Sequence, residues 1–324
     1  MNKKITFVLV LALAAFLVMG SASAGLFDFL GGGDSSTVKI GYLPSDHDAA
    51  LFVADAQGQY KNAGIETELV QFNNGGDLMT AMASGDIDVG YVGISPVLSS
   101  IEKGVPVKVI SAAQTEGSGL IVTDESGITS ASDLSGKSIA TPGDASIQHV
   151  LLTAYLKENG LSSDDIKESA MKVPSMNDAL KTKQIDGIIT FQPYVSIAEA
   201  EEGNTLLADS HAILPNHPCC VVVASDDFIK NHEDQVKTIV DIHENATDFI
   251  NDNIEEGKAS EVVKLLPEDI VSDPELEAQS LTSFPFISGI DEEFKGTLDA
   301  FQTIEVELGI IKQPIPDKDL YWEA

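Results

Sequence analysis

Short β-type runs alternate with helical runs from Thr37 onward, and this alternation constrains the fold more than any other feature of the chain. Several helical runs end at a glycine, which closes a helix well because it adopts a left-handed backbone at little cost. Strands interleaved with helices predict a largely parallel sheet covered on both faces, so we expect an α/β fold. The expected strands are 37–44, 65–72, 87–93 and 105–114, and the expected helices are 48–62, 77–84 and 96–103.

A later block repeats this order of elements, which predicts two lobes that are built alike. The stretch DLMTAMASGDIDVGYVGISP (77–96) is echoed by DALKTKQIDGIITFQPY (178–194), and Asp88 and Asp186 occupy equivalent points in the two. A simpler explanation of these aspartates stays open, because aspartate suits the turn that enters a strand.

Two apolar segments, 119–125 and 219–227, are expected to cross between the lobes. We therefore place the first lobe at 37–122 and 220–324, and the second lobe at 123–219. Helical patterns in the C-terminal part are expected to pack on the first lobe, and they cover 234–254, 258–266, 274–282 and 291–308.

The N-terminus has the pattern of an export signal. Lys3 and Lys4 precede an apolar run, and Ser-Ala-Ser-Ala then matches a cleavage site after Ala24. We expect a signal peptide at 1–24 and a linker at 25–36. The alternative is an uncleaved anchor, because the apolar stretch approaches the roughly 20 residues that span a bilayer. In both cases the lobes are expected to work outside the cytoplasm, in the periplasm or on the outer face of the cytoplasmic membrane.

The charge of the chain limits its partners. The sequence contains no arginine and carries a formal net charge of -32. We expect no nucleic-acid partner, because neutralising phosphates requires a basic face. The acidic surface is expected to keep the protein soluble, in salty surroundings for instance, or to attract a cationic ligand.

Loops that follow strands are the candidates for a binding site, because ligands of open α/β sheets bind beyond the carboxyl ends of the strands. Some of these loops run directly into a helix, whose first turn offers unpaired N–H groups and a partial positive charge. A small anion can therefore be held by neutral donors, without arginine. The candidate ligand-binding residues are Ser45, Asp46 and His47; Gly93, Ile94 and Ser95; Gln114; Gly143, Asp144, Ala145 and Ser146; Gln192; and His217.

Two roles near the loop at 141–146 stay open. Ser146 either offers its hydroxyl to a ligand or only caps the helix that follows it. His149, three residues further on, either faces the cleft or packs below it.

Two adjacent cysteines, Cys219 and Cys220, are the only ones in the chain. A disulfide between neighbours closes a strained ring, so we expect free thiols at the start of a buried strand. A pairing of Cys220 with His217 would lack a group to orient the base. No four His, Cys or Asp residues have the sequence spacing of a metal site. No nucleophile elbow, zinc-binding helix motif or phosphate-binding loop is present in the sequence either. We therefore expect neither a metal, nor a cofactor, nor an enzyme.

Three segments in this order carry a family resemblance: VKIGYLPSDHDAALFVADAQGQYKNAGIETELVQFNNGGDLMTAMASGDIDVGYVGISPV, then SDLSGKSIATPGDASIQHVLLTAYLKENGL, then IDGIITFQPY. Together they resemble the substrate-binding proteins of nitrate, sulfonate and taurine ABC importers, over about residues 37–310. The resemblance implies a type II periplasmic-binding-protein fold, in which two α/β lobes joined by two crossovers close on one small molecule. It also implies that the loops named above hold the acidic group of the ligand.

The resemblance implies an extracytoplasmic solute-binding protein, expected to be a monomer, that delivers its ligand to a membrane permease driven by a cytoplasmic ATPase. We expect a small organic anion or zwitterion, sulfonate- or taurine-like. Asp46 and Asp48 would repel an anion unless they meet the cationic end of a zwitterion. One alternative is a heterocyclic vitamin precursor such as a pyrimidine, stacked on Tyr42, Tyr91, Phe191 or Tyr194. Another is a biosynthetic enzyme on the same fold.

Overall fold

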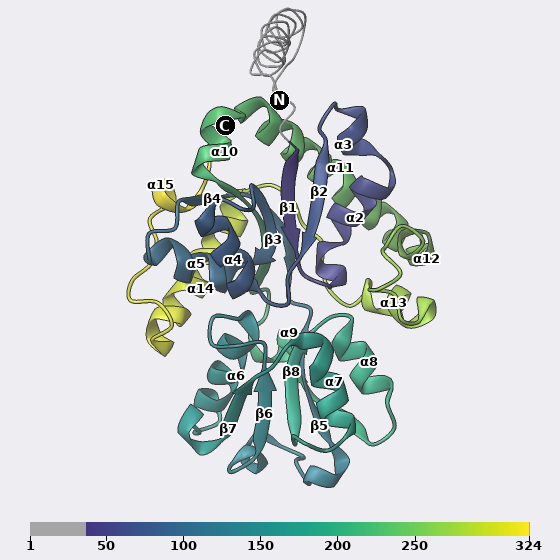
Figure 1. Ribbon diagram of the computed structural model, residues 1–324. Helices are drawn as coiled ribbons and strands as arrows, with labels where there is room; N and C mark the ends of the chain where they lie inside the picture. Colours follow the sequence, from purple (N-terminus) through teal and green to yellow (C-terminus); the bar gives the residue numbers. More distant parts are fainter. Residues whose placement is uncertain (1–36, 324) are drawn as a thin grey trace, which may run out of the picture. The chain divides into compact units, whose positions relative to one another are not determined.

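The computed structural model describes residues 37–323, so the predicted signal or anchor and the predicted linker lie outside the described residues. The described chain forms two five-stranded sheets with helices around them (Figure 1). In the first sheet the strands lie in the order β2 (Thr67–Gln71), β1 (Val38–Tyr42), β3 (Val89–Gly93), β10 (Pro218–Ser225) and β4 (Val107–Thr115). In the second the order is β7 (Lys167–Ala170), β6 (Ser138–Thr141), β8 (Gly187–Phe191), β5 (Ser118–Thr123) and β9 (Asn204–Asp209).

Each sheet is largely parallel, as expected from the sequence, but contains one antiparallel strand. Strand β1 runs parallel to β2 and β3, but β10 runs antiparallel to β3 and β4. Strand β5 is antiparallel to β8 and β9 in the same way. The reason is the route of the chain. A strand that arrives from the other sheet starts at the end where its new neighbours finish, and therefore runs against them.

The segments expected to cross between the lobes do not cross. Strand β5 lies wholly in the second sheet and β10 wholly in the first. The chain passes between the sheets just before each of them, through Glu116–Gly117 and through the segment that follows helix α9 (Ser210–Ile213). The apolar parts of 119–125 and 219–227 are buried on an inner strand of a sheet, which explains their composition without a crossing.

The two sheets contain an equivalent hydrogen bond to an aspartate at the entry of a strand. Asp88, just before β3, accepts a bond from the backbone N–H of Lys39 in β1 (2.9 Å). Asp186, just before β8, accepts one from the N–H of Ser138 in β6 (2.8 Å). Each aspartate thus joins the beginnings of two parallel strands. The sequence echo reflects both a common architecture and the suitability of aspartate for a strand entry.

Helices cover both faces of the first sheet. Gly90 in β3 leaves room on one face for Leu78 and Met82 of α4, where an added Cβ would lie 2.8 Å from Leu78. Its neighbour Tyr91 points to the other face and contacts His243 of α11. The helices that accompany the first sheet are α2 (Ala49–Ala56), α3 (Gln59–Asn62), α4 (Gly75–Ser84), α5 (Ile94–Glu102), α10 (Asp226–Asn231), α11 (Glu233–Glu255), α12 (Ala259–Val263), α13 (Pro274–Ser280), α14 (Glu292–Leu308) and α15 (Asp317–Leu320).

The expected helix at 48–62 is interrupted. Residues Asp46–Asp48 form a short 3₁₀ turn, η1, and Gly58 separates α2 from α3 with a left-handed backbone (φ +67°). The second sheet carries α6 (Ile147–Glu158), α7 (Val173–Lys181) and α8 (Tyr194–Ala200). Within residues 37–323, no helix has both the length and the apolar character required to cross a membrane.

Candidate functional site

A cavity of about 200 Å³ lies where loops of the two sheets meet. Its wall is mainly apolar carbon with a few polar groups, which is typical of a small-molecule site. The lining residues from the first sheet and its helices are Leu43, Ser45, His47, Asp48, Asn74, Gly75, Gly76, Gly93, Pro96, Cys219 and Cys220. Those from the second are Pro142, Gly143, Asp144, Ala145, Ser146, Ile147, Gln148 and Phe191.

Seven candidate residues line this cavity: Ser45, His47, Gly93, Gly143, Asp144, Ala145 and Ser146. The other six, Asp46, Ile94, Ser95, Gln114, Gln192 and His217, lie behind the wall. Asp46 accepts a hydrogen bond from Ser280 (2.6 Å). Gln114 accepts one from the N–H of Cys220, and His217 contacts the carbonyl of Leu214.

Three helices begin at the cavity wall, and the first turns of two of them, α4 and α6, offer neutral donors there. Helix α4 is capped by Asn74, which accepts a hydrogen bond from the N–H of Asp77 (2.9 Å). The first N–H groups of a helix have no partner inside the helix, so those of Gly75 and Gly76 stay available at the wall. Helix α6 follows Ser146 and presents Ile147 and Gln148 at the wall in the same way. Helix α5 follows Gly93, but its first-turn residue at the wall, Pro96, has no N–H to offer.

Gly75 and Gly76 are not among the residues predicted from the sequence, although the sequence contains a signal for them. The run Asn73-Asn74-Gly75-Gly76 sets a capping residue and two glycines directly before an apolar helical pattern. An added Cβ on Gly75 would lie 2.7 Å from Pro96, so a glycine is needed there for the two helix starts to approach each other.

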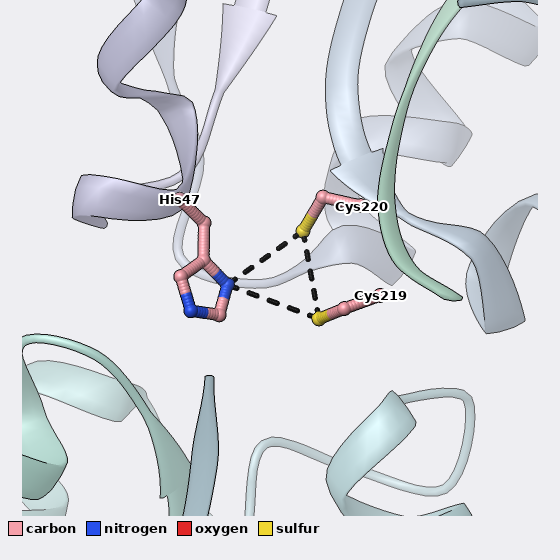
Figure 2. Close-up of side chains that lie close together, drawn as sticks. All are labelled: His47, Cys219 and Cys220. Atoms are coloured by element: carbon pink, nitrogen blue, oxygen red, sulfur yellow. Dashed lines mark hydrogen bonds between the residues drawn. The ribbon is translucent and has the colours of Figure 1, made fainter. Parts of the chain in front are cut away.

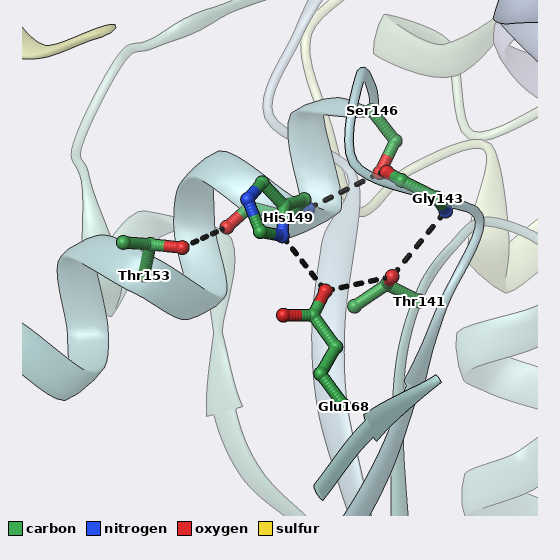
Figure 3. Close-up of polar contacts among 6 residues, drawn as sticks. All are labelled: Thr141, Gly143, Ser146, His149, Thr153 and Glu168. Carbon is green, nitrogen blue, oxygen red and sulfur yellow. Dashed lines mark hydrogen bonds and ion pairs between the residues drawn. The ribbon is translucent and has the colours of Figure 1, made fainter. Parts of the chain in front are cut away.

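Ser146 acts as a helix cap. Its hydroxyl accepts from the N–H of His149 (3.2 Å) and donates to the carbonyl of Gly143 (2.6 Å), as Figure 3 shows. His149 packs below the cavity and does not line it: its Nδ1 lies 2.7 Å from Glu168, which also accepts from Thr141. The bond with Glu168 raises the pKa of His149 above its ordinary value. These contacts brace the start of α6.

His47 and the two cysteines form a compact cluster in the cavity wall, shown in Figure 2. The distances from His47 Nδ1 to Cys219 Sγ and Cys220 Sγ are both 3.8 Å, and the two sulfurs are also 3.8 Å apart. Both thiols are free and buried, as expected. A pairing of Cys220 with His217 was considered from the sequence, but the imidazole beside both thiols is that of His47.

An irregular backbone brings both sulfurs to one side. Successive side chains of a regular strand point to opposite faces. The pairing of β10 with β4 shifts register on both sides of Cys220, between Pro218 and Cys220 and again between Cys220 and Val221. A bulge of this kind redirects a side chain. Cys219 and Cys220 therefore both reach the cavity although they are neighbours.

Burial and close contacts shift the protonation of these groups. The hydrogen bond from Cys220, helped by His47, holds the pKa of Cys219 well below the ordinary thiol value. The same contact and burial raise the pKa of Cys220. Burial also raises the pKa of Asp48 to about 8 and that of Asp46 to about 6. Asp48 is thus mostly protonated at neutral pH, which lessens the repulsion of an anion that its sequence position predicts.

The two crossings between the sheets are tied together by Glu116. Its backbone has a positive φ of 62°, and its carboxylate accepts bonds from the N–H of Asn216 (2.7 Å) and from His211 (2.7 Å). Its own N–H donates to the carbonyl of His217. One buried carboxylate therefore couples both connections. The next residue, Gly117, contacts His47 through its carbonyl oxygen (3.2 Å).

Only one of the four rings considered for stacking lines the cavity, namely Phe191. Tyr91 is buried against His243, and Tyr42 packs edge-on against Phe52. Tyr194 packs edge-on against Phe191 from the far side of the wall.

Comparison with known proteins identifies relatives with a similar fold. The described fold is similar to the ligand-binding component of an ABC-type import system of Staphylococcus aureus, solved with zinc bound (TM-score 0.77, 22% identity, 89% of this chain and 96% of the other). It is also similar to the alkanesulfonate-binding protein SsuA of Xanthomonas axonopodis pv. citri bound to MOPS (TM-score 0.76, 18% identity, 90% of this chain and 100% of the other). The taurine-binding periplasmic protein of Escherichia coli is 29% identical over 201 residues, 62% of each chain.

The expected two-lobe fold of periplasmic binding proteins and the resemblance to proteins of sulfonate and taurine importers are thereby confirmed. A model of the family described as NMT1-like matches residues 31–267. Since that match covers more than half of the 324 residues, the chain belongs to the NMT1-like family.

Proposed function

We propose that this protein is an extracytoplasmic solute-binding protein of an ABC importer, and that it captures a small organic anion or zwitterion, preferably a sulfonate of the taurine type. The observation that carries this proposal is the convergence of the first turns of α4 and α6, one from each sheet, on one cavity. Amide N–H groups and the positive end of the helix dipole bind an anionic oxygen well, so the absence of arginine is no obstacle. The named solutes of the taurine- and alkanesulfonate-binding relatives are of this class.

Binding by closure of two lobes accounts for the layout of the cavity. Each lobe comprises one sheet with its helices, and the chain connects them through Glu116–Gly117 and the segment after α9. A solute that contacts Gly76 on one lobe and Ile147 on the other binds the closed arrangement better than the open one, and so shifts the population towards closure. Capture and release need no covalent step, and we assign no enzymatic activity.

The partners follow from this role. The closed protein would dock on a membrane permease whose cytoplasmic ATPase drives uptake, and the chain would work in the periplasm or on the outer face of the cytoplasmic membrane. The relatives named as periplasmic or import-system binding proteins support this placement.

The test begins with the protein as purified. Native mass spectrometry detects any bound small molecule, and calorimetry after its removal compares taurine, an alkanesulfonate, nitrate and a substituted pyrimidine. We expect taurine or the alkanesulfonate to bind with one site per chain. Binding of the pyrimidine alone, with both sulfonates inert, would refute the proposal and favour stacking on Phe191.

A matched pair of variants tests the amide donors themselves. Gly76→Pro removes one N–H from the first turn of α4, where proline is tolerated, and Gly76→Ala keeps that N–H. Bonds to charged groups are worth about 1.5–3 kcal/mol, so the proline variant should bind the sulfonate at least about 10-fold more weakly than the alanine variant. Equal affinities would show that this helix start does not hold the anion.

A further inference from the structure

The function proposed above makes no use of the cluster formed by His47, Cys219 and Cys220. The three residues are 2–6% exposed, and each lines the cavity. They come from two distant parts of the chain, η1 and the first residues of β10, and converge on one point in Figure 2. Two thiols and an imidazole are a ligand set that thiophilic metal ions prefer.

The spacing of the three ligand atoms fits such an ion. Zinc lies about 2.3 Å from sulfur and about 2.0–2.1 Å from an imidazole nitrogen, so tetrahedral angles place two sulfurs about 3.8 Å apart and sulfur and nitrogen about 3.6 Å apart. The observed separations are all 3.8 Å. An ion can therefore sit between the three atoms with little movement of their side chains.

The imidazole is oriented as a metal ligand requires. Its Nε2 donates to the carbonyl oxygen of Gly117 (3.2 Å), so Nδ1 is the ring nitrogen that faces the two sulfurs. Histidine ligands usually donate their second ring N–H to a carbonyl or carboxylate in this manner. The ring of Phe284 packs edge-on against His47 at 4.7 Å and holds its plane.

Charge and access also agree with a bound cation. Two thiolates balance one divalent ion, so no net charge would be buried. Three ligands leave the fourth tetrahedral position open, as in catalytic rather than structural zinc sites. Because all three residues line the cavity, that position faces the space where a solute or water would lie.

We propose that His47, Cys219 and Cys220 form a binding site for one thiophilic divalent ion of the zinc class, with its open coordination position directed into the solute cavity. This assignment goes beyond sulfonate capture and does not depend on it. A solute with an amine or carboxylate can complete the coordination, and water does so in its absence.

The test uses the full-length protein in a thiol-free reductant, after treatment with a chelator. Titration with Co²⁺ should produce thiolate-to-cobalt charge-transfer absorption and intense four-coordinate visible bands that saturate at one ion per chain. Added Zn²⁺ should bleach both signals and protect both thiols from alkylation. The absence of charge-transfer absorption would overturn the proposal without any variant being needed.

Variants assign the ligands. We expect a large loss of Zn²⁺ affinity in each of three variants: Cys219→Ser, Cys220→Ser and His47→Gln. Each loss should exceed the roughly 10- to 100-fold that follows removal of a group hydrogen-bonded to a metal ligand. His149→Gln is the matched control, because His149 belongs to a separate group with Asp144 and Glu168 and should leave the cobalt spectrum unchanged. A spectrum that survives in both cysteine variants, or that disappears with His149→Gln, would contradict the site.

The ion and the solute are measured separately, so the two proposals can fail independently. Zinc binding is titrated without sulfonate, and sulfonate binding is titrated in the presence of a chelator. Sulfonate binding without cobalt absorption removes only the metal site, whereas cobalt absorption without sulfonate binding removes only the proposed function.

Discussion

The hydroxyl of Ser45 donates a hydrogen bond of 2.7 Å to the backbone carbonyl of Gln192, and this bond joins the two sheets across the cavity. The same oxygen accepts from the N–H of His47 (3.1 Å) and thereby caps η1. Both partners are buried. One side chain thus links the local fold of the first loop to the approach of the second lobe.

Replacement of Ser45 by alanine should weaken solute binding more than it lowers stability. The buried carbonyl of Gln192 would lose its partner only in the arrangement where the lobes meet, which costs about 1–2 kcal/mol, or roughly 5- to 30-fold in affinity. Calorimetry with the solute identified in the screen measures this loss. Ser84→Ala, an exposed change on α4, is the control and should leave affinity unaltered.

Ser146→Ala should behave as the loss of a helix cap rather than of a ligand contact. The hydroxyl is engaged with His149 and Gly143, so we expect about 1 kcal/mol of lost stability and an affinity within about 3-fold of the parent. Ser225→Ala removes an equivalent cap from α10, away from the cavity, and should cost a similar amount in urea unfolding. A large loss of affinity confined to Ser146→Ala would assign its hydroxyl to the ligand instead.

Gly117→Ala should disturb both the crossing and His47. The added Cβ would lie 2.3 Å from His47 Nε2, on a backbone with φ +80°. We expect about 2–4 kcal/mol of destabilisation, which combines backbone strain with overpacking. Gly85→Ala has nearly the same φ of +79° with nothing within 4 Å, so it reports the strain alone at about 1 kcal/mol. Equal unfolding free energies for the two variants would contradict the contact.

His243 should make the protein less stable in acid. Burial lowers its pKa from 6.5 to about 4, while its Nε2 donates to the carbonyl of Ala112 (2.8 Å). Between these two pKa values the unfolded chain binds a proton that the folded chain does not, so stability falls as the pH decreases through this window. The total loss is about 3 kcal/mol.

Urea unfolding at several pH values measures that loss by difference. His243→Gln keeps a donor for Ala112 but cannot be protonated, so its stability should fall by about 3 kcal/mol less than that of the parent across the same window. His232→Gln removes a histidine that is only partly buried and serves as the control. Parallel pH profiles for the parent and His243→Gln would exclude this role.

The fold was largely predictable because each element carries its own local signal. The expected strand at 87–93 and helix at 291–308 match β3 and α14 closely, because a short, fully buried run and a capping Asp291 are local features of the sequence. The direction of β10 was not predictable, because it depends on how the chain returns from the other sheet. The interruption at Gly58 is local, but a glycine within a helical pattern is compatible with either outcome.

The candidate site was predictable only in part, for the same reason. The loops at 44–48 and 141–146 follow strands, and both contribute to the cavity wall. His47 is separated from Cys219 and Cys220 by 172 and 173 positions in the sequence. The cluster also depends on a bulge in β10, which no short sequence pattern predicts. Gln114 and Gln192 sit at the expected strand ends, but their side chains bind protein groups behind the wall.

The place of β10 between β3 and β4 has a consequence for the order in which the protein forms. A ribosome releases all five strands of the second sheet as one uninterrupted stretch, β5 to β9, before it has made β10. The first sheet, although it begins earlier, lacks its inner strand until Ser225 has emerged. The first lobe therefore cannot complete its sheet until the second lobe has been synthesised, and the edges of β3 and β4 that pair with β10 stay exposed until then.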